Sequence, residues 1–270
     1  MQAAADGDAK PMPNRPTVLV TGASRGIGAG IARVLATRGA RIAAHFHRNR
    51  DAIDAVVGSL PGAGHRAFAA DIGDADAAAR LWHDVSEAFG VVDALVNNAG
   101  IYLFHPPLAS AESEWRAAWQ ETLATNLIGP ATLSLLAAQT MAARPGPVDG
   151  TFGRGRIVNI SSRGAFRGEP DAPAYAASKA GLNALGQSLA RALAPQQIYV
   201  YTLAPGWVET DMATEHLAGP DGDSIRAQHP LGRVTQAEEL ANAVAYCVLE
   251  APPAMTGGII DVNGASYLRS

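Results

Sequence analysis

The stretch TVLVTGASRGIGAGIARVLATRG, residues 17–39, decides the fold. Its first residues form a short apolar run that predicts a buried strand, and helical periodicity begins near residue 26. Gly22, Gly26 and Gly28 lie at the turn between them, where glycines let the backbone approach a ligand closely and the helix N-terminus stabilises phosphate. In this context the turn predicts a pyrophosphate site, with a tight turn that binds no ligand as the alternative.

The same alternation of apolar runs and helical stretches continues along the chain and predicts a parallel sheet with crossover helices. Strands are expected at 17–22, 41–46, 66–71, 92–97, 156–161, 198–204 and 259–262. Helices are expected at 26–38, 51–60, 75–88, 112–141, 173–194 and 236–249. We therefore predict an α/β fold: a single doubly wound Rossmann-type domain over residues 16–270, with a mostly parallel seven-stranded sheet, helices on both faces and a flexible arm at 1–15.

Composition excludes several other classes of function. The formal charge of −4 and the scattered arginines argue against nucleic acid or an anionic membrane surface as a partner. The single cysteine, Cys247, lies in an apolar helical stretch, which fits an inert buried thiol in a reducing compartment. Without the pattern of a signal peptide or an apolar run of about 20 residues, we expect a cytoplasmic protein.

Tyr175 and Lys179 are four residues apart in the predicted helix 173–194, so their head groups lie on one face. Lys179 is one of only two lysines in the chain, the other being Lys10. A surface pair is the ordinary alternative, but a phenol beside a rare ammonium also suits an acid–base site.

Several motifs occur in order and together resemble the short-chain dehydrogenase/reductase family across roughly residues 15–266. They are TGASRGIG at the glycine turn, Asp71 with Ile72, NNAG at 97–100, Asn126 in TNLIGP, IVNISS ending at Ser162, YAASK with Tyr175 and Lys179, and PGWVET at 205–210. Within this family the chain looks nearest to the β-ketoacyl-acyl-carrier-protein reductases, through YAASKAGL and HPLGRVTQAEELANAV.

The resemblance implies a catalytic set made of Asn126, Ser162, Tyr175 and Lys179. Tyr175 would exchange a proton with the substrate oxygen, and a nearby Lys179 cation is expected to lower the phenol pKa from about 10. Ser162 would orient that oxygen, and Asn126 would hold a water linked to Lys179. Ser161 is the alternate serine, because Ser162 has the family's spacing of thirteen residues before Tyr175 and Ser161 has fourteen.

The resemblance also implies a nicotinamide dinucleotide as cofactor. Its contacts would come from Gly22, Ser24, Arg25, Gly26, Ile27, Gly28, Phe46, His47, Arg48, Asp71, Ile72, Asn98, Ala99, Gly100, Tyr175, Lys179, Pro205, Gly206, Val208 and Thr210. An acidic residue at the end of the second strand would mark NAD, but Phe46 stands there, so we expect NADP(H), with NAD(H) as the alternative.

Substrate and partners are less closely defined by the sequence. We expect the substrate to be a carbonyl or secondary alcohol, such as a 3-oxoacyl thioester or another small ketone. A substrate loop is expected at about 211–230. Docking of an acyl carrier protein is doubtful, because Arg154 and Arg156 match one basic region of the reductases but Pro195–Gln197 replaces the other.

By analogy, helices 112–141 and 173–194 would form the interface of a homotetramer or homodimer. His45 and His47 alternate on a strand without a third ligand nearby, so no metal is expected. The functional alternatives are an NAD-dependent alcohol dehydrogenase of the same family and a catalytically idle nucleotide-binding scaffold.

Cofactor preference gives the first prediction. Arg25 and Arg48 flank the expected position of the NADP 2′-phosphate, with His47 or Arg50 taking this role if the strand end is shifted by one residue. Two such contacts should make NADPH bind about a hundredfold more tightly than NADH. Dissociation constants of both nucleotides, in wild type and in Arg25→Ala and Arg48→Ala, test this. Equal affinities in wild type, or variants that weaken NADH as much as NADPH, would contradict it.

Overall fold

The computed structural model describes residues 15–145, 150, 152–210, 213, 217–220 and 222–269 of the chain. Seven strands form one sheet in the order β3-β2-β1-β4-β5-β6-β9, and every neighbouring pair is parallel. The strand order reverses between β1 and β4, as in a doubly wound sheet. The predicted fold class is confirmed.

The strands lie close to their predicted positions. Their bounds are β1 Thr17–Val20, β2 Arg41–Phe46, β3 Arg66–Ala69, β4 Ala94–Asn97, β5 Gly155–Ile160, β6 Ile198–Pro205 and β9 Ile259–Val262. β1, β4 and β5 are buried along their whole length, because helices cover both faces of the central sheet. Their carboxyl ends therefore meet at one edge, where a doubly wound sheet binds its ligands.

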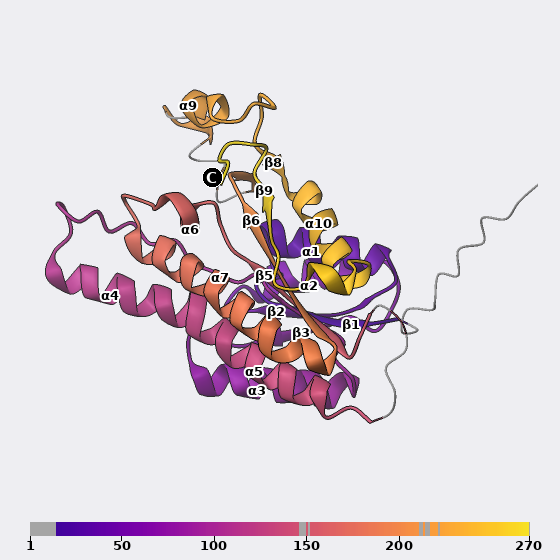
Figure 1. Ribbon diagram of the computed structural model, residues 1–270. Coiled ribbons are helices and arrows are strands. Elements are labelled where there is room, and N and C mark those ends of the chain that lie inside the picture. Colours follow the sequence, from indigo (N-terminus) through magenta and orange to yellow (C-terminus); the bar gives the residue numbers. More distant parts are fainter. Residues whose placement is uncertain are drawn as a thin grey trace, which may run out of the picture.

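Helices cover both faces of the sheet (Figure 1). One layer holds α1 Gly26–Thr37, α2 Arg50–Ser59 and α10 Ala237–Leu249; the other holds α3 Ala75–Phe89, α4 Glu112–Leu123, α5 Gly129–Ala142 and α7 Pro173–Leu193. Alternate strand residues supply the two cores: Val18 and Val20 pack with the first layer, and Leu19 packs with the second.

One predicted helix is divided in the structure. The helix expected at 112–141 consists of α4 and α5 joined by a π-helix, Ala124–Ile128, which contains the buried Asn126. Such π-helical insertions often occur at functional sites, and this one turns the Asn126 side chain into the molecule.

The segment expected to form the substrate loop is only partly described. It contains a short helix, α9 Gly222–Ala227, and it is framed by the small parallel pair β7 Val208–Glu209 and β8 Thr235–Gln236. Residues 211–212, 214–216 and 221, and the arm 1–14, lie outside the described residues. Another short helix, α6 Gly164–Arg167, follows β5 and was not predicted. Among the described helices, none has the length and apolar character needed to cross a membrane.

Candidate active site

The glycine turn after β1 has no space for a side chain at Gly22 or Gly28. Gly22 and Gly26 have φ of +65° and +53°, a region that favours glycine. A Cβ at Gly28 would lie 2.1 Å from the carbonyl oxygen of Gly22. The glycines are therefore needed for the close approach between this turn and the first turn of α1.

The N-terminus of α1 is suited to bind an anion. The N-cap residue, Arg25, makes no side-chain capping bond, and no acidic residue lies in the first turn of α1. The first N–H groups of a helix lack partners within the helix, and the helix dipole places partial positive charge there. This end of α1 could therefore hold a phosphate, and the phosphate site stays a prediction.

His45 on β2 connects the glycine turn to the end of β3. Its Nδ1 accepts a hydrogen bond from the Gly22 amide at 3.1 Å, and its Nε2 lies 3.1 Å from the Ala70 carbonyl oxygen. These partners require a neutral ring with hydrogen on Nε2. Burial lowers the pKa of His45 to about 4, despite the opposing effect of the Ala70 carbonyl.

The segment after β4 lies against the same turn. The Thr21 hydroxyl accepts hydrogen bonds from the amides of Asn98 and Ala99, and the Asn98 side chain donates to the Thr21 carbonyl oxygen. A Cβ at Gly22 would lie 2.9 Å from the Cα of Ala99. One position earlier, the Asn97 side chain bonds Asn159 of β5 at 2.9 Å, which joins the two central strands.

Asn126 holds Ile101, the residue that follows the NNAG segment at 97–100. Its Oδ1 accepts from the Ile101 amide at 2.8 Å, and its Nδ2 donates to the Ile101 carbonyl oxygen at 2.9 Å and to Ser178 at 3.2 Å. The amide thus satisfies both backbone groups of Ile101. The water that the resemblance assigns to Asn126 stays a prediction.

The geometry favours Ser162 over Ser161 as the serine beside Tyr175. The Ser162 hydroxyl lies beside the Tyr175 side chain and acts to lower its pKa, and it accepts from the Gly164 amide at 3.0 Å. The Ser161 hydroxyl instead donates to the backbone carbonyl of Lys179.

Lys179 lies beside Tyr175, but the expected lowering of the phenol pKa is not found. Burial raises the pKa of Tyr175 to about 12, and the neighbouring Ser162 hydroxyl opposes this only in part. The Lys179 ammonium donates to the Ile160 carbonyl oxygen at 2.8 Å, and it contacts Tyr175 through the ring, 5.7 Å from the centroid. Burial also lowers the pKa of Lys179 to about 8. Desolvation therefore dominates both groups here, and the phenol holds its proton at neutral pH.

The ends of β2 and β3 meet where the adenosine half of the cofactor was expected. His47 Nε2 lies 3.6 Å from an Asp71 carboxylate oxygen, and Ile72, which follows Asp71, is buried. Arg25 and Arg48 are exposed, as a phosphate contact requires. The Phe46 side chain is buried in the core, so a nucleotide would meet this residue through its backbone, and this contact stays a prediction.

The residues after β6 lie close to the glycine turn. A Cβ at Gly26 would lie 3.4 Å from the Thr210 Cγ2, although Gly26 and Thr210 are far apart in sequence. Pro205 ends β6, Val208 is buried in β7, and Gly206 packs against Asn263. Ser24 and Ile27 are half-buried in the turn itself. The structure thus brings together the residues expected to bind the phosphates and those expected to bind the nicotinamide.

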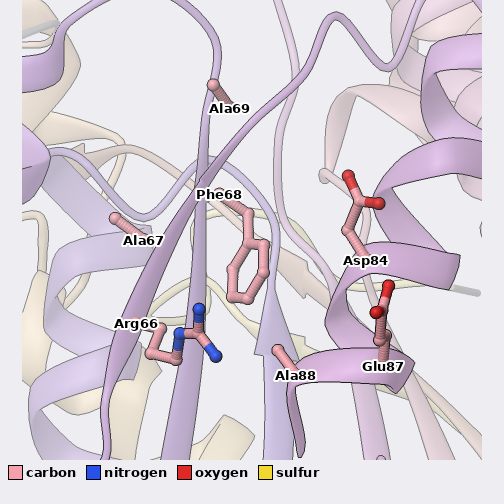
Figure 2. A pocket seen from close by; sticks show the side chains of 7 residues that line it. All are labelled: Arg66, Ala67, Phe68, Ala69, Asp84, Glu87 and Ala88. Atoms are coloured by element: carbon pink, nitrogen blue, oxygen red, sulfur yellow. The ribbon is translucent and has the colours of Figure 1, made fainter.

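A hollow between β3 and α3 is separate from this site (Figure 2). Its lining is Arg66, Ala67, Phe68, Ala69, Asp84, Glu87 and Ala88, none of which belongs to the predicted set. Among the described residues, no group of three or more His, Cys, Asp or Glu side chains could hold a metal ion. His45 is buried and His47 is exposed beyond the strand end, so the two do not form a pair of ligands.

Sequence reasoning missed two buried histidines, His45 as a hydrogen-bonding residue and His105 altogether. His105 accepts a hydrogen bond from the Ala174 amide, one residue before Tyr175. The sequence signal for His45 as a buried residue is its place within the short apolar run at 42–46. No local pattern indicates that His105 bonds a residue 69 positions away in sequence.

Comparisons with known proteins agree with this geometry. A family profile described as Enoyl-(Acyl carrier protein) reductase matches residues 22–265. The 3-oxoacyl-(acyl-carrier-protein) reductase FabG of Staphylococcus aureus is 35% identical over 254 residues, which is 93% of this chain and 98% of the relative. The protein of the same name from Escherichia coli is 35% identical over 250 residues, covering 93% of this chain and 96% of the relative.

Solved structures give the same result. A short-chain dehydrogenase from Burkholderia cenocepacia in complex with NADP has a TM-score of 0.80 and 35% identity, covering 93% of this chain and 97% of that one. A short-chain dehydrogenase/reductase, glucose/ribitol dehydrogenase, from Brucella melitensis has a TM-score of 0.82 and 31% identity, with coverage of 95% and 98%.

The buried His45 gives a prediction on stability. The folded protein keeps this ring neutral down to a pH of about 4, whereas the unfolded chain takes up a proton below about 6.5. Stability is therefore lost as pH falls through this window, by about 2 kcal/mol between pH 7.5 and pH 5. His45→Asn, which keeps an acceptor near Gly22, should lose this part of the pH dependence.

Urea unfolding at the two pH values measures the effect. His83→Asn removes an exposed histidine and serves as the control. An equal loss of stability at pH 5 in wild type and His45→Asn would show that His45 does not cause it.

Proposed function

The chain belongs to the short-chain dehydrogenase/reductase family, and from that premise we propose that it reduces a 3-oxoacyl-type or other small carbonyl with NADPH. The observation that carries the proposal is the contact between Ser162 and Tyr175 beside a buried Lys179, at the sheet edge that also holds the glycine turn. In the free protein the Tyr175 phenol keeps its proton at neutral pH and is available as a donor, and efficient reduction requires that the bound cofactor and Lys179 make it more acidic.

The residues present fit a dinucleotide. A side chain would not fit at Gly22 or Gly28, the first turn of α1 carries no acidic residue, and no acidic residue stands at the end of β2. When bound, NADPH would supply the hydride equivalent that reduces the carbonyl carbon. The α1 N-terminus would hold the pyrophosphate, Arg25 and Arg48 the 2′-phosphate, and Lys179 the nicotinamide ribose.

The chain's own residues would handle the proton. The Ser162 hydroxyl lies against the Tyr175 side chain, so a carbonyl oxygen that accepts from both would lie between two O–H donors. As negative charge develops on that oxygen, Tyr175 gives up its proton. The Lys179 ammonium over the Tyr175 ring then stabilises the charge left on the phenol.

The two arginines expected to contact an acyl carrier protein, Arg154 and Arg156, give little support for such docking. Arg156 is fully buried, donates to the Cys247 carbonyl oxygen at 2.8 Å and stacks on Tyr201, so it cannot meet an acidic partner. Arg154 is half-buried and donates to the Arg144 carbonyl oxygen. We therefore favour a thioester or ketone that binds without a carrier.

Assembly and location remain part of the proposal. Ile128 and Leu135 are exposed apolar side chains, at the C-terminal end of the π-helix and on α5, and would be covered in a homotetramer or homodimer. Light scattering measures the mass of the assembly. A cytoplasmic location fits the free, buried Cys247.

Tyr175→Phe tests the proposed reaction. Removing the hydroxyl should lower turnover of acetoacetyl-coenzyme A, a 3-oxoacyl thioester, or of a small ketone from a panel, by roughly a hundredfold or more. Affinity for NADPH, measured by fluorescence titration, should stay within about threefold, because the glycine turn is unchanged.

Two results would contradict the proposal. A wild-type protein that binds NADPH but turns over no carbonyl in the panel would favour a nucleotide-binding scaffold. A Tyr175→Phe variant that keeps more than about a tenth of wild-type turnover would remove Tyr175 from the role of proton donor.

A further inference from the structure

The N-terminus of α7 lacks a cap from its own sequence. The N-cap residue is Ala172, which has no side chain able to accept a hydrogen bond, and Pro173 follows without an N–H group. The amides of Tyr175 and Ala176 bond the Ala172 carbonyl oxygen. Of the first N–H groups, the Ala174 amide therefore depends on a partner from elsewhere in the fold.

His105 supplies that partner from the loop after β4. Its Nε2 accepts from the Ala174 amide at 3.2 Å, and its Nδ1 lies 2.7 Å from the Leu103 carbonyl oxygen. A carbonyl needs a donor and an amide needs an acceptor, so the ring is neutral with hydrogen on Nδ1. A protonated ring could not accept from Ala174 and would place charge at the positive end of the helix dipole.

The surroundings hold the imidazole in one orientation. His105 is only 1% exposed, and its ring packs edge-on against Trp115 with centroids 5.3 Å apart. Its backbone amide donates to the Asp171 carbonyl oxygen at 2.8 Å. The loop after β4 is thus joined to the segment before α7 by both the backbone and the side chain of His105.

The same loop also contacts the phenol. Tyr102 packs on Tyr175 with ring centroids 5.1 Å apart and an interplanar angle of 59°. Ile101, one residue earlier, is held on both sides by Asn126. A change in the position of His105 would therefore shift both the first turn of α7, which carries Tyr175, and the aromatic ring that packs on Tyr175.

We propose that His105 is a positioning residue for proton transfer, which caps α7 and thereby fixes the Tyr175 phenol relative to Ser162. This inference rests on the proposed function, because it assumes that Tyr175 gives the proton. Small displacements of a reacting group lower catalysis strongly, whereas the nucleotide site around the glycine turn does not involve His105.

A matched pair of variants separates the effect of the hydrogen bond to Ala174 from the effect of the volume of the His105 side chain. His105→Gln carries an amide oxygen at about the reach of Nε2, so it can accept from Ala174. His105→Asn has the same amide on a shorter side chain and is expected to fall short of Ala174. His105→Ala removes the acceptor, and His83→Ala, at an exposed position, is the control for loss of a histidine.

The measurements are kcat and KM for acetoacetyl-coenzyme A, the Kd of NADPH and the solvent deuterium isotope effect on kcat. We expect kcat to fall about tenfold or more in His105→Ala and His105→Asn, with the Kd of NADPH within about threefold and a larger isotope effect. His105→Gln should restore kcat to within about threefold of wild type, as His83→Ala should.

Each contrary result has a distinct meaning. The inference is wrong if His105→Ala keeps kcat within about twofold, if Gln restores no more than Asn, or if kcat falls without a change in the isotope effect. If His105→Ala does not fold, the comparison of Gln with Asn decides alone. Turnover retained in Tyr175→Phe would overturn the proposed function itself, whereas an inactive Tyr175→Phe beside an active His105→Ala would overturn only this inference.

Discussion

The buried ammonium of Lys179 is the constraint on which the rest of the site depends. A charge in the interior is costly unless it is hydrogen-bonded, and the Ile160 carbonyl oxygen at the end of β5 accepts from it. A Cβ at Gly100 would lie 3.4 Å from Nζ and 3.3 Å from the Asn126 Oδ1. The residue at position 100 must therefore be small, because a larger side chain would press on the ammonium and on the Asn126 amide.

The loops around this charge are held by buried polar side chains that bond to backbone groups. Asn126 satisfies both backbone groups of Ile101, His45 joins the glycine turn to the end of β3, and His105 caps α7. Each side chain comes from one segment and fixes another that is distant in sequence. These hydrogen bonds fix the relative positions of the loops at the sheet edge, and a site for proton transfer requires such fixed positions.

Sequence predicted the features that depend on local pattern. β2 and β9 begin and end where expected, since apolar residues with turn residues on either side define them. The glycine turn could be assigned because glycine itself reports the required backbone conformation. Ser162, Tyr175 and Lys179 could be named because motifs in order carry the resemblance to a family, and the structure brings them together.

Features that depend on tertiary contacts could not be predicted. The π-helix at Asn126 arises where a side chain bonds the backbone of Ile101, which periodicity along 112–141 does not show. The Phe46 side chain lies in the core, which its place at the strand end does not indicate, and burial reversed the expected direction of the Tyr175 pKa. Desolvation depends on all the neighbours of a group, whereas the spacing of Tyr175 and Lys179 reports only one of them.

The pKa of Tyr175, measured with and without NADP⁺, tests the role of this phenol most directly. Carbon-13 NMR of protein labelled at tyrosine Cζ follows the ionisation, and Tyr175→Phe identifies the resonance. Burial raises the pKa to about 12 in the free protein, so no ionisation is expected there below a pH of about 10. The positive nicotinamide ring and the adjacent Lys179 should lower it to below about 9 in the complex. A pKa that stays near 12 when NADP⁺ is bound would contradict the assignment of Tyr175 as the proton donor.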